Sequence, residues 1–249
     1  GARPGQISRA VKKAGDFADG KPNTFVGEFS AAPERLPPDP EWEAEIRRVI
    51  DEMPGDPIDK AKNVKFLGLI APGACVVSLA KGVENGTLKR MTEVLAEELP
   101  GAAARLAVLS GPTFASEVAQ GKPTGATVAA RDAGVAAQLQ ASLSGSRFRL
   151  YAETDVVGIE IGGALKNVIA IAAGMSDGLG FGHNARSLLI SRGLAEIARL
   201  GLSLGASPQT FAGLSGLGDL VLTCTGDLSR NRTVGMRIGR GENLKEILS

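Results

Sequence analysis

A lysine stands inside an apolar, helix-forming stretch where the pattern calls for an apolar or small residue. The stretch is GALKNVIAIAAG at residues 162–173, and the lysine is Lys166. On a helix its side chain would lean back over Gly162 and Gly163, which leave an open notch. Because each glycine costs a helix up to roughly 1 kcal/mol relative to alanine, two in succession indicate a close approach. An ammonium group there can stabilise and protonate a negatively charged oxygen. Alternatively, the notch admits another helix and the lysine reaches out to water.

Two further motifs follow predicted strands. VVSLAKGVENG places Lys81 just past a strand end, where ligands bind in open parallel sheets; the alternative is a solvated loop lysine. LSGPTFASEVAQG offers Gly111 after another strand and Thr113 at a predicted helix start. Backbone N–H groups and a hydroxyl would then face an anion. The alternative is an ordinary strand-to-helix turn.

A third motif, GLSGLGDLVLTCTGDLSRNRTVG, sets Asp219 in a glycine-rich turn and then Ser229, Arg230 and Asn231 at a helix start. Arginine has a planar fork that matches phosphate oxygens, and a helix N-terminus adds backbone donors. A capped surface helix is the alternative. The single histidine, His183, lies in GLGFGHN, which neither follows a strand nor opens a βαβ unit, so we interpret it as a loop residue.

The elements that would position these residues change along the chain. Strand-like runs at 74–79, 105–109, 124–130 and 147–151 alternate with helical segments, which predicts a parallel α/β sheet. After Asp155 long helical stretches at about 155–175 and 185–205 predict an all-α domain. The predicted units are an irregular segment with one helix near 41–53, a sheet domain and a helical domain, at 1–60, 61–152 and 153–249.

Composition excludes several function classes. The formal net charge is +1, which provides no basic surface for a nucleic-acid backbone or an anionic membrane. Cys75 and Cys224 are far apart and match no metal-ligand spacing, so we expect no metal site and a reducing compartment. We expect no apolar run that reaches the 18 or so residues of a membrane span.

Together these stretches resemble the bacterial and plastid type of NAD(P)-dependent glycerol-3-phosphate dehydrogenase. The matching motifs lie between about residues 72 and 249, in the order VVSLAKGVE, AVLSGPTFASEVAQGKPT, DVVGIEIGGALKNVIAIAAGMSDGLGFGHNARSLLISRGLAEIARLG and TFAGLSGLGDLVLTCTGDLSRNRTVG. The resemblance implies a partial Rossmann-like domain followed by a helical substrate domain. It also implies reversible hydride transfer between NAD or NADP and a phosphorylated triose, supplying glycerophospholipid precursors, in a homo-oligomer such as a dimer of the cytoplasm or the plastid stroma.

The resemblance further implies residue roles. Lys166 matches the lysine that donates a proton to the substrate oxygen in reduction and accepts it in oxidation. A free lysine, with a pKa of about 10.4, is poorly suited to this, but burial and a second cation such as Lys81 would lower the pKa. The implied substrate contacts are Lys81, Gly111, Thr113, Lys166, Asp219, Ser229, Arg230 and Asn231, and the implied cofactor contacts are Lys81, Ala115 and Arg230.

The sequence departs from the family pattern at both ends. The family opens with a GxGxxG turn that receives the cofactor pyrophosphate, and no glycines upstream of Lys81 have that spacing. The chain also stops at GENLKEILS, before the family's last helices. An abbreviated dehydrogenase is therefore expected, with NAD and NADP undecided. The alternative is a non-catalytic phosphometabolite-binding or assembly protein that has lost the cofactor cradle. An enzyme for another β-hydroxyacid is disfavoured, because residues 229–231 suit a phosphate better.

Overall fold

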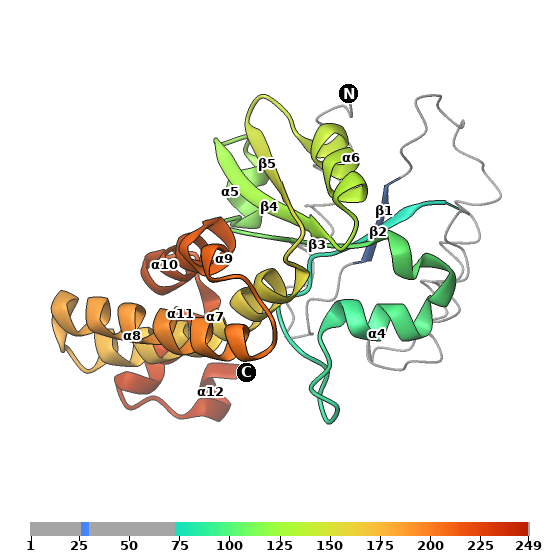
Figure 1. Cartoon of the computed structure of the whole chain (residues 1–249). Coiled ribbons are helices and arrows are strands. Elements are labelled where there is room, and N and C mark those ends of the chain that lie inside the picture. The colour runs from blue at the N-terminus through green and yellow to red at the C-terminus, as the bar shows by residue number, and fades with distance from the viewer. Residues whose placement is uncertain (1–25, 30–72, 249) are drawn as a thin grey trace.

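The computed structural model describes residues 26–29 and 73–248 (Figure 1). The helix predicted near 41–53, and most of the segment 1–60, lie outside the described residues. The exception is the strand β1 (Val26–Phe29), which lies in a segment predicted to be irregular. Its pairing with the next strand accounts for a strand that shows no periodicity of its own.

A five-stranded sheet forms the first part of the fold, in the spatial order β1-β2-β3-β4-β5. All four predicted strands are present as β2 (Cys75–Ser78), β3 (Leu106–Ser110), β4 (Thr124–Ala130) and β5 (Phe148–Glu153). The pairs β2/β3 and β4/β5 are parallel as predicted, whereas β1/β2 and β3/β4 are antiparallel. Between β3 and β4 the only helix is α5 (Ala115–Ala119), about 7 Å long. Because that helix cannot carry the chain back along the sheet, β4 runs antiparallel to β3.

Helices cover both faces of the sheet (Figure 1). Successive side chains of a buried strand point to opposite faces of the sheet, so that β2 and β3 each contribute to two cores. On one face α6 (Ala133–Leu143) packs its apolar side against strand residues such as Val77 and Val128. On the other face Val76 meets α4 (Met91–Glu98) and the 3-10 turn η1 (Pro100–Arg105), and Val108 meets the start of the next long helix.

From Val156 onward the described residues form helices only. The two predicted long helices are α7 (Val156–Gly178) and α8 (Gly182–Ser203). They are followed by α9 (Pro208–Ala212), the π-turn η2 (Leu214–Gly218), α10 (Asp219–Thr225), α11 (Arg230–Gly239) and α12 (Leu244–Leu248). Asp155 begins α7 by accepting a hydrogen bond from Gly158 N at 2.8 Å. The α/β sheet followed by helices is the predicted fold class.

The helix α7 is the centre of the helical part and contacts the sheet, α8, α10 and α11. Two glycines allow the backbones of α7 and α11 to touch. A Cβ atom on Gly174 would lie 2.0 Å from the carbonyl oxygen of Arg232, and one on Gly235 would lie 2.0 Å from that of Ile171. The close approach fixes α11, and with it the predicted substrate residues at its start, against the helix that carries Lys166.

The composition of α7 corrects one expectation. Its 23 residues include an 18-residue window of mean hydropathy 1.6, which is long and apolar enough to cross a membrane, although the sequence was expected to contain no such run. More than half of that window, 56%, is buried inside the protein. Burial against the sheet and the neighbouring helices explains the apolar composition, as it does for core helices in general.

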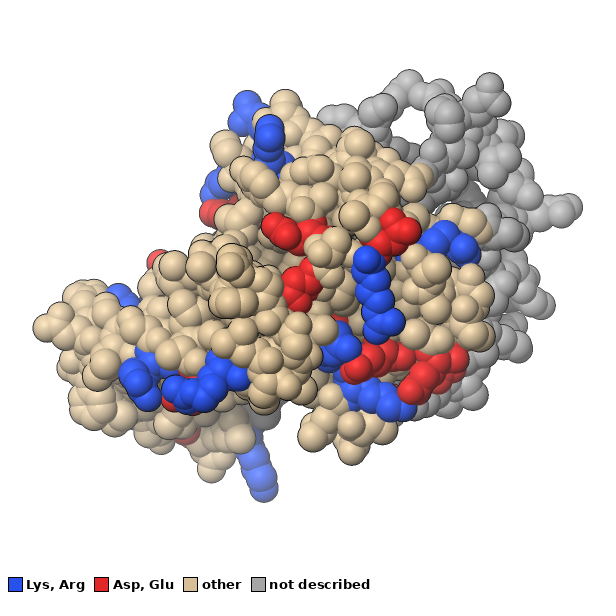
Figure 2. Space-filling view, in the orientation of Figure 1, with Lys and Arg blue, Asp and Glu red and all other residues tan. Residues whose placement is uncertain are grey.

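Charged side chains are mixed over the described surface. On the face shown in Figure 2, lysine and arginine lie beside aspartate and glutamate over both the sheet domain and the helices. This face of the described residues therefore presents no extended basic surface of the kind that nucleic-acid backbones require.

Candidate active site

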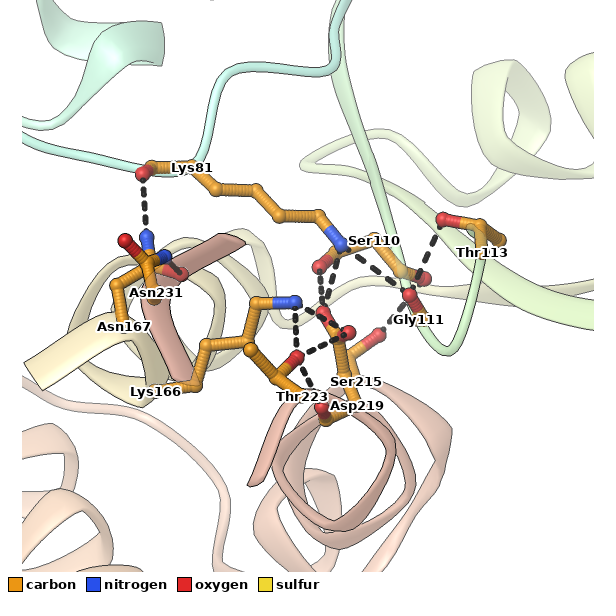
Figure 3. A network of polar contacts seen from close by, with 10 residues as sticks. All are labelled: Lys81, Ser110, Gly111, Thr113, Lys166, Asn167, Ser215, Asp219, Thr223 and Asn231. Atoms are coloured by element: carbon orange, nitrogen blue, oxygen red, sulfur yellow. Dashed lines mark hydrogen bonds and ion pairs between the residues drawn. The ribbon is translucent and has the colours of Figure 1, made fainter. Parts of the chain in front are cut away.

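Lys166 lies in the middle of α7 and is buried, with 6% of its surface exposed. Its ammonium group donates a hydrogen bond to Asp219 Oδ1 and another to Thr223 Oγ1 at 2.8 Å (Figure 3). The side chain therefore does not reach out to water, which excludes that part of the alternative considered from the sequence. A buried ammonium group requires such partners, because an unpaired charge in the interior is costly.

The glycine notch beside Lys166 is filled by the protein itself. A Cβ atom on Gly162 would lie 2.8 Å from the carbonyl oxygen of Ser215, in η2. A Cβ atom on Gly163 would lie 3.1 Å from Ser110 Oγ and 3.5 Å from Lys81 Cγ. The glycines thus admit η2 and the Lys81 side chain, a correction to the idea that they leave an open hollow beside the lysine.

Asp219 joins the two lysines. It is the first residue of α10, is 1% exposed, and binds Lys166 through Oδ1. Lys81 Nζ lies 2.7 Å from Asp219 Oδ2 and donates a second hydrogen bond to the carbonyl oxygen of Gly111 at 3.1 Å. Two predicted site lysines and the predicted aspartate therefore meet at one point, although Lys81 and Asp219 are 138 positions apart in the sequence.

The electrostatics of this cluster perturb Lys166. Burial is the largest cause and lowers the pKa of Lys166, the nearby Lys81 ammonium lowers it further, and Asp219 opposes both. The result is a pKa of about 8, in the direction expected from the sequence. A lysine with this pKa exists in both protonation states near neutral pH, as a group that donates and recovers a proton requires.

Asn231 is linked to the lysine cluster through α7. Its side-chain amide donates to Asn167 Oδ1 at 2.9 Å, and Asn167 Nδ2 donates to the carbonyl oxygen of Lys81 at 3.2 Å (Figure 3). The start of α11, the middle of α7 and the loop after β2 are thus held together by one chain of hydrogen bonds.

Ser229 and Arg230 take other positions. The Ser229 hydroxyl is buried and accepts a hydrogen bond from Arg232 N at 3.2 Å, so it caps α11. Arg230 is exposed and lines a hollow of about 290 Å³ with Thr233, Arg237 and four other residues of 227–247. Within the described part of the chain, no hydrogen bond or ion pair joins Arg230 to the lysine cluster.

The turn after β3 differs from the predicted helix start. Gly111 has a φ of 144°, and a Cβ atom there would lie 2.9 Å from Ala126 Cα, so the position requires glycine. Thr113 Oγ1 donates to the Gly111 carbonyl oxygen at 3.1 Å, and α5 begins two residues later, at the exposed Ala115. Thr113 therefore shapes the turn beside Lys81 and is not the cap of a helix.

Four residues of the cluster were not predicted as site residues: Ser110, Asn167, Ser215 and Thr223. Ser110 Oγ lies 3.4 Å from Asp219 Oδ2, and Ser215 Oγ donates to the Ser110 carbonyl oxygen at 3.1 Å. Thr223 carried a sequence signal, because it is four residues after Asp219 and lies on the same face of α10. Asn167 directly follows Lys166 on the small-residue side of α7.

Two family models match this chain. The model described as the NAD-dependent glycerol-3-phosphate dehydrogenase N-terminus matches residues 60–136, and the model of the C-terminus matches residues 155–249. Among curated proteins, glycerol-3-phosphate dehydrogenase [NAD(P)+] of Geobacter sulfurreducens is 60% identical over 72% of this chain and 54% of its own length. That of Myxococcus xanthus is 59% identical over 70% and 52%. The chain spans about half the length of these relatives.

Solved structures agree with the family models. Glycerol-3-phosphate dehydrogenase from Coxiella burnetii superimposes with a TM-score of 0.70 at 41% identity, over 76% of this chain and 57% of that one. The yeast enzyme, from Saccharomyces cerevisiae, superimposes with a TM-score of 0.64 at 28% identity over the same shares. Because models of both halves of the family match in order, and the fold is shared, the chain belongs to the NAD-dependent glycerol-3-phosphate dehydrogenase family.

Proposed function

We propose that the protein catalyses reversible hydride transfer between NAD(P)H and dihydroxyacetone phosphate, giving sn-glycerol 3-phosphate, a precursor of glycerophospholipids. The observation that carries the proposal is the pair of lysines on one buried carboxylate, Lys166 and Lys81 on Asp219. With both lysines protonated this cluster carries two positive charges and one negative charge. It therefore favours an anionic substrate and the negative charge that forms on a carbonyl oxygen during reduction.

The steps follow from these side chains. The nicotinamide cofactor, when bound, supplies the hydride that adds to C2 of the triose. As that bond forms, negative charge develops on the C2 oxygen, and Lys166 donates a proton to it, which leaves the lysine neutral. In oxidation the neutral Lys166 takes the proton from the C2 hydroxyl. Asp219 and Thr223 hold the Lys166 nitrogen in place throughout, because both are already its hydrogen-bond partners.

The substrate phosphate is assigned to the start of α11. Asn231 faces the cluster, and Arg230 precedes it with a long side chain that would turn inward from its outer hollow. Lys81, Gly111 and Thr113 are assigned to the triose. Ser229 contributes by capping α11 rather than by direct contact. Binding energy from the phosphate would fix the carbonyl beside Lys166.

The described residues fit the reacting end of the cofactor. Lys81 and Gly111 follow the parallel strands β2 and β3, the place where nucleotides approach such sheets, and Ala115 is the nearby exposed residue assigned to the cofactor. No GxGxxG spacing occurs upstream of Lys81, so no pyrophosphate cradle is assigned and NAD is not separated from NADP. We further propose a homo-oligomer located in the cytoplasm.

A non-catalytic phosphometabolite-binding or assembly protein is the second candidate, favoured by the absence of that spacing. Two measurements separate the candidates. Titration of NADH and NADPH fluorescence should show saturable binding, and addition of dihydroxyacetone phosphate should oxidise the bound cofactor. Cofactor binding absent up to millimolar concentration, with retained phosphometabolite binding, would establish the second candidate.

The role of Lys166 is tested by replacement. Lys166→Met should abolish turnover while the fold persists, and the matched control Lys245→Met, on exposed α12, should behave as the parent protein. Retained turnover in Lys166→Met would remove this lysine from the chemistry. Replacing Arg230 with Ala should chiefly raise KM for the phosphorylated substrate, and an unchanged KM would remove Arg230 from the phosphate site.

A further inference from the structure

Lys81 belongs to a loop whose tip is exposed. Residues 79–90 leave β2, turn back on themselves and enter α4, and Figure 1 shows them projecting away from the sheet. The turn is closed by a bridge between Val83 and Arg90 and by hydrogen bonds from Glu84 N to Lys89 O at 2.9 Å and from Leu88 N to Glu84 O at 3.0 Å. Leu88, at its tip, is 74% exposed and has a φ of 59°. The Lys81 ammonium group itself is held by Asp219 and the Gly111 carbonyl oxygen, and the backbone of the loop is held to α7 by hydrogen bonds at its two ends.

Both ends of this loop are attached to α7. At the first end, Asn167 Nδ2 donates to the Lys81 carbonyl oxygen at 3.2 Å, and Gly163 admits the Lys81 side chain. At the second end, Glu160 Oε1 accepts from Thr92 N at 2.8 Å. Glu160 Oε2 accepts from Thr92 Oγ1 at 2.7 Å and from Arg90 Nη1 at 2.9 Å. Residues 160, 163 and 167 are spaced by three and four, so they share one face of α7.

Glu160 is buried, although its hydrogen-bond partners lie where a surface loop enters α4. Only 4% of the residue is exposed, and burial raises the pKa of its carboxyl group, while Thr92 and Arg90 oppose the rise. A buried carboxylate is costly unless it is paired and hydrogen-bonded. Here all its contacts go to Arg90 and Thr92, at the end of the loop and the first turn of α4.

Capping of α4 alone does not explain this carboxylate, because α4 already has a local cap. Glu93 accepts hydrogen bonds from Arg90 N at 2.8 Å and from Arg90 Nη2 at 2.6 Å. Its side chain is 39% exposed and does not contact α7 in any hydrogen bond or ion pair. What Glu160 adds is the connection between α4 and the helix of Lys166.

We propose that Glu160 is a positioning residue: it fixes the far end of the Lys81 loop to α7 and thereby holds the Lys81 ammonium beside Lys166. The proposal rests on the proposed function insofar as these two amines are the catalytic pair. In this proposal α7 carries Lys166 and also sets the distance between Lys166 and Lys81. Glu160 does not touch substrate in this scheme and acts only through Lys81.

The positioning role has a consequence that a merely structural role lacks. The charged or titratable groups facing Lys166 are Lys81 from the loop and Asp219 and Cys224 from α10. Those facing Glu160 are Arg90 and Glu93. Releasing the loop would move Lys81 away and leave the α10 groups in place. The pKa of Lys166 would then rise, and it would rise only if Lys81 carries a charge.

The test uses the full chain with 13C-labelled lysine and follows the Lys166 resonance, assigned by its loss in Lys166→Met, across a pH titration. Glu160→Gln should raise the pKa of Lys166 by most of the rise seen in Lys81→Met. In the Lys81→Met background, Glu160→Gln should produce no further rise. The matched control Glu93→Gln, which weakens the local cap of the same helix, should leave the Lys166 titration unchanged.

Two outcomes would overturn the proposal: a Glu160→Gln shift no larger than that of Glu93→Gln, or an equal shift with and without Lys81. Should Glu160→Gln not fold, Thr92→Val removes only the hydroxyl contact with Glu160 and keeps the side-chain shape. It should raise the pKa of Lys166 in the same direction and speed amide hydrogen exchange in 79–90. Absence of both effects in Thr92→Val would equally overturn the proposal.

These readouts need no turnover, so the two hypotheses fail separately. If dehydrogenase activity is absent but the Lys166 shift depends on Lys81 as described, the proposed function is refuted and the positioning role stands. If activity is present and Glu160→Gln leaves both the titration and kcat unchanged, the positioning role is refuted and the proposed function stands.

Discussion

The pH dependence of the two reaction directions is the sharpest test of Lys166 as the acid/base. In the proposed mechanism, reduction requires a protonated Lys166 and oxidation requires a neutral one. The pKa of this lysine is lowered from 10.5 to about 8, first by burial and then by the Lys81 ammonium. The perturbation is therefore a change of pH from 7 to 9, which crosses this pKa while the substrate phosphate, with a second pKa of about 6, stays ionised.

The magnitude follows from the protonated fraction. With a pKa of about 8, roughly nine-tenths of Lys166 is protonated at pH 7 and roughly one-tenth at pH 9. The reduction rate should fall about tenfold and the oxidation rate should rise about tenfold, each levelling off beyond the window. An unperturbed lysine predicts a different pattern: reduction would change by only about 3%, and oxidation would rise about a hundredfold without levelling.

The assay is kcat for NAD(P)H oxidation by dihydroxyacetone phosphate, measured in buffers of constant ionic strength. A parallel measurement with deuterated cofactor shows that hydride transfer limits the rate. Under that condition, a reduction rate that is equal at pH 7 and pH 9 would refute the reasoning. It would mean either that Lys166 is not the proton donor or that its burial does not lower its pKa.

Three further predictions concern stability. Below pH 8 Lys166 is protonated in the folded protein, and the free energy of unfolding is about 3 kcal/mol lower than it would be with a neutral Lys166 in both states. Between pH 8 and 10.5 the unfolded chain binds more protons than the folded one, so the free energy of unfolding of the parent protein should rise by about 3 kcal/mol relative to that of Lys166→Met. Denaturant titrations in which the difference between the two proteins stays constant over this pH range would contradict the lowered pKa. Thr223→Val should cost about 1 kcal/mol at pH 7 by removing a partner of the ammonium group, measured in the same way. Gly174→Ala should cost about 3 kcal/mol by forcing α7 and α11 apart, whereas Gly145→Ala, which meets no atom within 4 Å, should change the melting temperature little.

Much of the fold could be predicted because it depends on local patterns. The strand β4 and the helices α7 and α8 have strong periodicity or composition, and their positions agree with the sequence prediction. The antiparallel run of β4 could not be predicted in the same way, because it depends on how far α5 extends. Strand direction is a property of the connection and not of the strand.

The residues of the candidate site likewise include some that the sequence predicted and some that it could not predict. Lys166, Lys81 and Asp219 were predicted, and the structure brings them together. Glu160 was read only as part of an apolar helix, because its partners are 68 and 70 positions away and nothing in the local sequence identifies them. Long-range polar contacts of this kind depend on how the fold brings the first turn of α4 to Glu160, which a single sequence does not encode in any short motif.

If Lys166 is the acid/base, as proposed, the sharing of Asp219 by two lysines would let this buried acid lose its proton without leaving an unpaired charge. If Asp219 had Lys166 as its only partner, deprotonation would strand a carboxylate that is 1% exposed, at a cost of several kcal/mol. Lys81, 2.7 Å from the other carboxylate oxygen, remains as a counter-ion when Lys166 becomes neutral. The cluster then passes from one net positive charge to none, and Asp219 stays paired in both states. In the proposed mechanism the attachment of the Lys81 loop to α7 would therefore belong to the acid/base chemistry, because it would keep that counter-ion in place.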